Sequence, residues 1–259
     1  MEPSLPEYFE LWQRTLGWQP TPQQQANFQR LYRQILEANR HLNLTRLTTP
    51  EDFWEKHLWD SLRGIAPWLN PSLAQFSLPS EPSLRGIDVG SGGGFPGLPV
   101  AIVKTPSPKR PDAHGWQLYL VDATRKKVAF LTDVADKLAL PIKASAERAE
   151  VLGQHSHHRA RYDLALIRAV GSAPTCTEYT LPFLKRGGVA VLYRGQWTAE
   201  ESKVLEQIAP KLGGQVVQVD ACQTPLTQGI RHYIYLQKHQ ETPDIFPRGV
   251  GVPAKSPLS

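Results

Sequence analysis

The sequence predicts an α/β fold: a mostly parallel, doubly wound sheet that ends in an antiparallel hairpin, with a helical extension at the N-terminus. From residue 84 onward, apolar runs of strand length alternate with amphipathic stretches of helix length, an order typical of parallel sheets. A glycine-rich turn follows the first apolar run, at the edge where such sheets bind ligands. The last two apolar runs, 215–219 and 231–236, have no helix-length segment between them, so we expect them to pair antiparallel.

The composition indicates a globular chain and argues against a membrane-spanning or secreted one. Of the 259 residues, 41% are hydrophobic and 20% are charged. No run of about 18 apolar residues occurs that would predict a transmembrane helix, and the N-terminus lacks the basic start and apolar centre of a secretory signal. Cys176 and Cys222 lack C-x-x-C spacing, so we expect no zinc site, no disulfide framework and a cytoplasmic location.

Residues 1–70 are predicted to form the helical extension. Thr21, followed by a proline and by Gln24, forms a capping-box pattern that predicts a helix start. Thr49 repeats the start signal, with a proline and then two acids in the first turn, where the helix dipole favours negative charge. Two helices are therefore expected in this extension, one after Thr21 and one after Thr49.

Apolar residues recur at spacings of three and four after both starts, so each helix should bury one face. The stripes are Phe28, Leu31, Tyr32, Ile35 and Leu36 in the first helix, and Phe53, Trp54, His57, Leu58, Leu62, Ile65 and Leu69 in the second. His57 and Asp60 of the second helix are open to a functional role. A histidine on a packed helical face is more often a hydrogen-bonded core residue, and we favour that interpretation.

The rest of the chain divides by composition. Residues 71–83 are rich in Pro and Ser and are predicted to link the helical extension to the first strand. Residues 84–239 then form the α/β domain. Residues 240–259 are Pro-rich with few apolar side chains, so we expect a disordered tail.

The glycine-rich turn lies in the stretch 85–102, which reads R-G-I-D-V-G-S-G-G-G-F-P-G-L-P-V-A-I. It is predicted to join a buried strand at 84–89 to a helix at 96–103. Glycine is needed where φ is positive or where a ligand approaches bare backbone. The turn is therefore expected to hold a ligand.

Two ligands fit the spacing of these glycines. Gly92, Gly94 and Gly97 match the dinucleotide-binding spacing G-x-G-x-x-G, which predicts NAD. The run Asp88-x-Gly90-x-Gly92-x-Gly94 is instead similar to motif I of the class I methyltransferases that use S-adenosyl-L-methionine (SAM). The second match fits better, so we expect SAM.

The second predicted strand, 116–121, ends at Asp122. An acid at this position of a dinucleotide fold, and by the same geometry of a SAM fold, holds the two ribose hydroxyls. The alternative is that Asp122 caps the next helix, expected from Thr124 to Leu138, and the two roles are compatible. Before this strand, residues 104–115 contain three prolines and no apolar period, so we expect a long surface loop.

The remaining elements are read from the same alternation. Further strands are expected at 141–144, 162–170 and 187–193, with helices at 175–184 and 198–208. The strand at 162–170 is apolar enough to be central, and it carries Arg168 at its carboxyl end, the ligand-binding edge of open α/β sheets. An arginine there is informative, because burying a guanidinium without partners is costly.

The patterns of charged residues and histidines are weaker indications of function than the glycine-rich turn. The net charge is +5, and basic clusters at 104–110, 125–127 and 159–161 make phosphate contacts plausible, although each cluster alone is better explained as a solvated surface. The spacing H-x-H-H at residues 155–158 lacks a helical or strand frame. We therefore expect an exposed loop there and no metal site.

Several sequence blocks together resemble the bacterial RsmG (GidB) family. They are N-L-T at 43–45, K-H-L-W-D-S-L at 56–62, D-V-G-S-G-G-G-F-P-G-L-P at 88–99, V-D at 121–122 with K-K at 126–127, R-A-E at 148–150 and R-A at 168–169. The resemblance spans residues 30–237, and the F-P-G-L-P ending of the glycine turn is its most specific part. The loop at 104–115 and the tail from residue 240 depart from the family pattern.

The resemblance implies a class I SAM-dependent methyltransferase (Rossmann-like) sheet in which the domain at 84–239 binds SAM. It implies methyl transfer to N7 of one guanine in 16S ribosomal RNA, in the loop at the decoding site. The partner is then 16S rRNA or the small ribosomal subunit, with no metal. The family's SAM contacts carry over to Gly90, Phe95, Asp122, Ala123, Thr124, Ala149, Glu150 and Arg168. Arg168 is the expected catalytic residue, and it holds the SAM carboxylate or orients the guanine or its phosphate.

This chemistry needs alignment more than proton transfer. Guanine N7 carries a free lone pair and no proton, so in-line attack on the sulfonium methyl requires no general base. The chain has no obvious Cys nucleophile and no Asn-Pro-Pro-Tyr block after the fourth strand, which argues against methylation of cytosine C5 or of an exocyclic amine. Two other functions stay open: an NAD-binding oxidoreductase and a non-catalytic RNA-binding factor for ribosome assembly.

Overall fold

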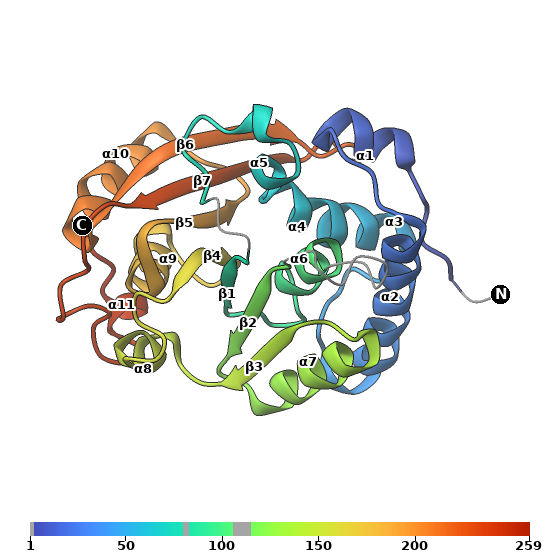
Figure 1. Cartoon of the computed structure of the whole chain (residues 1–259), viewed down its shortest axis with the longest axis horizontal. Helices are drawn as coiled ribbons and strands as arrows, with labels where there is room; N and C mark the ends of the chain where they lie inside the picture. Colours follow the sequence, from blue (N-terminus) through green and yellow to red (C-terminus); the bar gives the residue numbers. More distant parts are fainter. Residues whose placement is uncertain (1–2, 80–82, 106–114) are drawn as a thin grey trace.

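The computed structural model describes residues 3–79, 83–105 and 115–259. Within them the chain forms a seven-stranded sheet in the order β3-β2-β1-β4-β5-β7-β6 (Figure 1). Neighbours from β3 to β5 pair in parallel, whereas β7 pairs antiparallel with both β5 and β6. The strands are β1 (Arg85–Val89), β2 (Gln117–Asp122), β3 (Ile142–Ala146), β4 (Tyr162–Arg168), β5 (Leu184–Arg194), β6 (Gly214–Gln223) and β7 (Ile230–Lys238). The predicted mostly parallel sheet with an antiparallel terminal hairpin is confirmed.

Both faces of the sheet are buried, and the central strand β4 shows how the sequence achieves this. Leu164 and Leu166 belong to one apolar core, whereas Ala165 and Ile167 belong to a second. Successive side chains of a strand point to opposite faces, so a strand covered on both sides needs an unbroken apolar run. All four side chains are at most 1% exposed.

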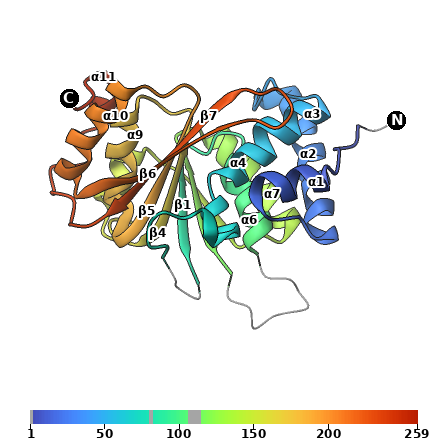
Figure 2. The same cartoon turned by 90° about the horizontal axis from the view of Figure 1, so that it is seen from above.

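Helices cover each face of the sheet as a separate layer (Figure 2). The first face carries α1 (Phe9–Leu16), α2 (Pro22–Leu42), α4 (Asp60–Arg63), α5 (Ala66–Leu69), α6 (Gly97–Lys104) and α7 (Arg125–Leu138). The second face carries α8 (Ala149–Gln154), α9 (Ala173–Thr180), α10 (Ala199–Ile208) and α11 (Val252–Lys255). The N-terminal helices thus share one core with the first face of the sheet.

The helix starts predicted for the extension are confirmed. The Gln24 N–H donates to Thr21 Oγ1 and the Thr21 N–H donates to the Gln24 side chain at 2.8 Å, which completes the capping box of α2. Thr49 caps α3 (Pro50–Phe53) by accepting from the Asp52 N–H. The predicted apolar stripe of α2 is buried at Phe28, Leu31, Tyr32 and Ile35.

From Phe53 to Arg63 the second predicted helix is buried at every position except Lys56, more than its apolar stripe indicated. It continues from α3 into a π-helical stretch, η1 (Trp54–Trp59), and then into α4. Among its buried charged residues, Glu55 and Arg63 are paired with the segment that forms β6 and β7. Glu55 Oε1 accepts from the Leu226 and Thr227 N–H groups, and Arg63 Nη2 lies 2.6 Å from Asp220 Oδ2. The hairpin of β6 and β7 therefore covers the side that the sequence pattern left polar.

Part of the predicted linker packs on the sheet. Residues 71–73 form a 3-10 turn, the Gln75 N–H donates to Gln218 Oε1 of β6 at 2.9 Å, and the Phe76 ring lies against Tyr235 of β7. The interior of the predicted loop at 104–115 lies outside the described residues. The division of the chain at 70, 83 and 239 stays a prediction.

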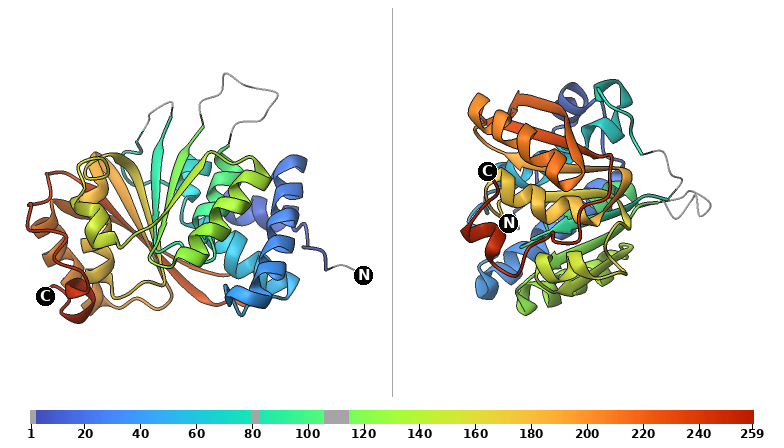
Figure 3. Two further views of the ribbon diagram at one scale, coloured as in Figure 1. Left: turned by 90° about the horizontal axis from the view of Figure 1, so that it is seen from below. Right: turned by 90° about the vertical axis from the view of Figure 1, so that its left-hand side faces the viewer.

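The prediction of a disordered tail at 240–259 is wrong. The segment runs over the second face of the sheet, where Figure 3 shows it in red on the side opposite the blue N-terminal helices. Arg248 makes a two-pronged ion pair with the fully buried Glu178 of α9, and Arg159 donates to the carbonyl oxygens of Thr242 and Phe246. The disorder prediction rested on the prolines and the few apolar residues, whereas this segment is anchored by charged hydrogen bonds.

Smaller predictions have mixed outcomes. The predicted helix at 175–184 is shorter and earlier: α9 ends at Thr180, because Pro182 has no N–H to continue the ladder, and β5 begins at Leu184. His155 and His157 are exposed as predicted, and His158 hydrogen-bonds Tyr162. Among the described residues no cluster of three metal-ligating side chains occurs, and no described helix is long and apolar enough to cross a membrane.

Candidate functional site

Two adjoining hollows lie at the carboxyl ends of β1, β2 and β4. The smaller, about 170 Å³, and the larger, about 370 Å³, share Gly90, Asp122, Ala123 and Val170. The smaller is also lined by Ala149, Glu150, Tyr179 and Ala254, and the larger by Leu44, His57, Phe95, Lys127 and Arg168. Strand β1 lies between β2 and β4, so this is the switch point at which open α/β sheets bind ligands.

The glycine turn forms the floor between the two hollows. The N–H groups of Gly90 and Ser91 both donate to the carbonyl oxygen of Val121, at 2.8 and 2.9 Å, which folds the turn back onto β2. Gly90 has a φ of 73°, and a Cβ added there would lie 2.5 Å from Cγ2 of Val170. Only glycine satisfies both the left-handed backbone and this close approach.

Asp88 fixes the far end of the same turn from inside the core. Its side chain is fully buried, and Oδ2 accepts from the Gly97 N–H at the start of α6, at 2.9 Å. Burial raises the pKa of this carboxyl to about 7, against the lowering effect of the bond from Gly97. Asp88 therefore holds the turn and α6 together and does not line either hollow.

The Asp122 side chain binds backbone N–H groups on both sides of the site, but it does not cap α7, whose N-cap is Thr124 and has no side-chain cap. Its Oδ1 accepts from the Thr124 N–H at 2.8 Å, and its Oδ2 accepts from the Gly92 N–H at 3.0 Å. Lys127 Nζ lies 3.9 Å from Oδ2. Each carboxylate oxygen has two lone pairs, so these bonds leave acceptor capacity for two hydroxyl groups of a ligand. Thr124 lines neither hollow, and its N–H serves as the donor to Asp122.

Glu150 closes the outer end of the smaller hollow. It is almost fully buried, and Oε1 accepts from Tyr179 Oη at 3.0 Å, from the Gly251 N–H at 2.9 Å and from Arg148 Nη2 at 3.2 Å. Burial acts to raise the pKa of this carboxyl, but these hydrogen bonds outweigh it and the pKa is lowered. The carboxylate is thus charged at neutral pH, and none of the three donors uses Oε2.

Arg168, at the end of β4, is held by the helical extension. Its Nη1 donates to the carbonyl oxygen of Lys56 at 2.9 Å and to Asp60 Oδ2 at 2.8 Å. Asp60 Oδ1 in turn accepts from Tyr233 Oη at 2.8 Å and lies 3.3 Å from Arg231 Nε. This network fixes the guanidinium at the wall of the larger hollow.

His57 completes that wall beside Arg168. Its ring stacks on Phe95 with centroids 4.1 Å apart, Nδ1 lies 3.4 Å from Arg168 Nη2, and Nε2 lies 2.8 Å from Thr45 Oγ1. A guanidinium only donates, so Nδ1 accepts and the proton is on Nε2. Burial, and then the charge of Arg168, lower the pKa of His57 to about 3. The imidazole is therefore neutral at pH 7.

The depressed pKa of His57 predicts an acid-sensitive site. Between pH 6.5 and 3 the unfolded chain binds a proton at this residue that the folded chain does not, so the free energy of unfolding falls as pH falls. Relative to His57→Gln, which does not titrate, the wild type should lose about 2 kcal/mol between pH 7 and pH 5. Urea denaturation at several pH values measures this difference. Parallel stability curves for the two proteins would contradict the prediction.

The structure brings most of the predicted site residues together. Gly90, Phe95, Asp122, Ala123 and Arg168 meet at the larger hollow, and Ala149 and Glu150 join three of them at the smaller one. Which of them bind a cofactor stays a prediction. Sequence reasoning placed His57 in the core, where it is, but missed that it also faces the site. Its position three residues before Asp60, in the block K-H-L-W-D, was the available signal.

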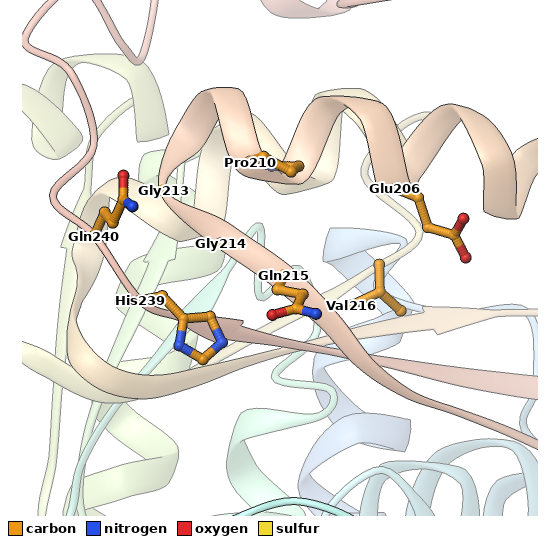
Figure 4. Close-up of a pocket in the computed structure, with 8 residues that line it drawn as sticks. All are labelled: Glu206, Pro210, Gly213, Gly214, Gln215, Val216, His239 and Gln240. Carbon is orange, nitrogen blue, oxygen red and sulfur yellow. The ribbon is translucent and has the colours of Figure 1, made fainter.

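Another hollow of about 520 Å³ lies apart from this site, between β6, the end of α10 and the residues after β7 (Figure 4). It is lined by Glu206, Pro210, Gly213, Gly214, Gln215, Val216, His239 and Gln240. It lies away from the glycine turn and from the carboxyl ends of the parallel strands. None of the predicted site residues lines this hollow.

Comparison with known proteins gives one family and one fold. The sequence model of the family described as "GidB: rRNA small subunit methyltransferase G" matches residues 24–234. A protein of Trichormus variabilis described as "Ribosomal RNA small subunit methyltransferase G" is 54% identical over 98% of this chain and 98% of its own length.

Among solved structures, a branched-chain polyamine synthase from Thermus thermophilus superposes with a TM-score of 0.54 at 12% identity, over 83% of this chain and 65% of the synthase. The CurJ carbon methyltransferase gives a TM-score of 0.52 at 12% identity, over 84% of this chain and 68% of its own. At such low identity these likenesses concern the fold alone, and they match the α/β sheet described above.

Proposed function

The chain belongs to the GidB family of small-subunit ribosomal RNA methyltransferases, and from this premise we propose that it methylates N7 of one guanine in 16S rRNA, using SAM. The target is the guanine of the loop at the decoding site. One observation carries the proposal: the family match extends over 24–234, and within that range the glycine turn, Asp122 and Arg168 meet at one strand-end site. Such a reaction belongs in the cytoplasm, where ribosomal RNA is found.

The residues of the two hollows fit SAM. Asp122 has free acceptor capacity for the ribose hydroxyls, and Ala149 with Oε2 of Glu150 suits the adenine edge and its amine in the smaller hollow. Gly90, where a Cβ would fill the floor, leaves room for the methionine part to approach the backbone. SAM supplies an electrophilic methyl group on a sulfonium ion.

The residues around the larger hollow orient a base without taking a proton. The lone pair of His57 Nδ1 faces Arg168 Nη2 and the pKa of the ring is lowered to about 3, so His57 is not arranged as a general base. Three of the five N–H groups of Arg168 are used by Lys56, Asp60 and His57, which leaves two for a guanine oxygen, a phosphate or the SAM carboxylate. A nucleophile with a free lone pair and no proton, such as guanine N7, needs only such alignment.

Basic residues beside the larger hollow suit an RNA partner. Lys127 lines it, and Arg125 and Lys126 are exposed in the same first turn of α7. Phosphate contacts by these cations would make RNA binding depend steeply on salt. A base within paired RNA is out of reach of a site this size, so the target guanine is taken from an unstacked loop.

The proposal is tested by measuring the transfer of a labelled methyl group from SAM to small-subunit RNA or to small subunits, and then mapping the modified nucleotide. We expect one labelled N7-methylguanine, and no label when 7-deazaguanine replaces the target, because carbon then stands in place of N7. Absence of transfer to both RNA and subunits would favour a non-catalytic assembly factor. Titration with NADH alongside SAM separates the remaining alternative, since NADH binding without SAM binding would indicate an oxidoreductase.

A further inference from the structure

The segment after β7 is anchored to two buried carboxylates on the second face of the sheet. Glu178 of α9 is fully buried, and Arg248 meets it with Nε and Nη2 at 3.1 and 2.7 Å, while the Arg248 N–H donates to it at 2.8 Å. Three residues later, the Gly251 N–H donates to Oε1 of Glu150 at 2.9 Å. We call residues 246–254 the C-terminal strap.

The strap reaches the smaller hollow. Ala254 is one of its lining residues, together with Ala149, Glu150 and Tyr179. The carbonyl oxygen of Pro253 accepts from Thr175 Oγ1 of α9 at 2.9 Å, which fixes the short helix α11 in this position. Figure 1 shows α11 beside α8 and α9, the two helices that supply the rest of the outer wall.

We propose that the C-terminal strap is a positioning element for the adenosyl part of the cofactor, an inference that rests on the proposed function. Gly251 holds Oε1 of Glu150, so that Oε2 is presented at a fixed place to an amine donor. Ala254 sets the depth of the hollow at its outer end. The strap lies beyond residue 234, where the match to the family ends, so it adds to the site from outside the part that the family model covers.

The proposal predicts a specific kinetic signature. The strap contacts the adenosyl end and not the larger hollow, so changes in it should alter cofactor binding and leave base orientation alone. The KM for SAM should then rise, while kcat at saturating SAM and the affinity for RNA stay close to those of the wild type. A strap that only stabilised the fold would not separate KM from kcat in this way.

The direct test fills the hollow from the strap. In the full-length protein, Ala254→Trp should weaken binding of SAM and of S-adenosylhomocysteine at least tenfold, and by the same factor, because the two ligands share the adenosyl group. The matched control is Lys255→Ala, the next residue of α11, which does not line the hollow and should bind both ligands as the wild type does. Calorimetry measures the affinities, and thermal melting and filter binding check the fold and the RNA affinity.

A second variant covers the case in which the tryptophan protein does not fold. Arg248→Ala releases the strap from Glu178 without adding bulk, and it should weaken both ligands several-fold in the same assay. If wild-type protein binds both ligands and neither variant changes the affinity, the strap does not position the cofactor. If the wild type binds neither ligand, the proposed function itself is wrong, so the two failures are distinct.

Discussion

Replacing Arg168 with alanine is expected to reduce methyl transfer by about 100- to 1,000-fold, the usual cost of removing one fixed donor from a site that stabilises charge. The guanidinium stands at the end of β4, beside the ring of Phe95 at 5.7 Å and above the larger hollow. Its two uncommitted N–H groups are charged donors at the wall of that hollow. Single-turnover transfer with saturating SAM and RNA measures the loss.

The fold should survive this substitution, because Asp60 keeps other partners. Without Arg168, its Oδ1 still accepts from Tyr233 Oη and pairs with Arg231. Arg168→Lys keeps the positive charge but loses the planar guanidinium with its fixed N–H directions, so it should recover only a small part of the methyl-transfer rate. Arg186→Ala, at the opposite end of the parallel strands, is the matched control and should transfer at the wild-type rate. Unchanged turnover by Arg168→Ala would show that the reacting atoms lie elsewhere.

Gly90→Ala should produce the second large effect, a fall on the order of 100-fold in kcat/KM for SAM, as expected when a site residue is displaced by about 1 Å. The new Cβ would meet Val170 at 2.5 Å while φ stays at 73°. To relieve both the contact with Val170 and the left-handed backbone, the glycine turn has to move into the space shared by the two hollows. Cofactor titration and steady-state kinetics measure the change.

Gly187→Ala separates backbone strain from the effect on the site. Gly187 has a φ of 82°, and an added Cβ meets nothing within 4 Å. This variant should lose about 1 to 2 kcal/mol of stability through the left-handed backbone and bind SAM normally. Adding Val170→Ala to Gly90→Ala should restore part of the cofactor affinity. Equal kinetics for the two glycine variants would mean that the glycine turn does not contact the cofactor.

The parts of the fold that follow local rules could be predicted from the sequence. The alternation of apolar runs with helix-length segments predicted the mostly parallel strands, and the missing helix between the last two runs predicted the antiparallel hairpin. The capping residues Thr21 and Thr49 gave the helix starts, since their side chains satisfy the first N–H groups of the helix. Boundaries failed where a proline intervened, as in α9, or where pairing extended a strand, as in β5.

Contacts between distant segments could not be predicted in the same way. The tail looked disordered because nothing in its composition reveals the buried Glu178 that binds Arg248. Glu55 lies in an apolar stretch. The pattern of that stretch does not indicate that the backbone N–H groups of residues 226 and 227 bind the Glu55 carboxylate. His57 and Ala254 reach the site from opposite ends of the chain. In each case the partner is fixed by topology and not by spacing.

The network around Asp60 also constrains how the protein matures. Asp60 and Tyr233 are 173 positions apart, and Glu55 and Leu226 are 171 apart. Bringing such distant segments together requires closing very long loops, which slows folding. During synthesis Asp60 therefore lacks its bonds to Tyr233 and Arg231 until β7 has emerged. A chain that is still being translated already contains Arg168 and its direct partners Lys56 and Asp60, but the outer half of the network is completed only when nearly the whole protein has been made.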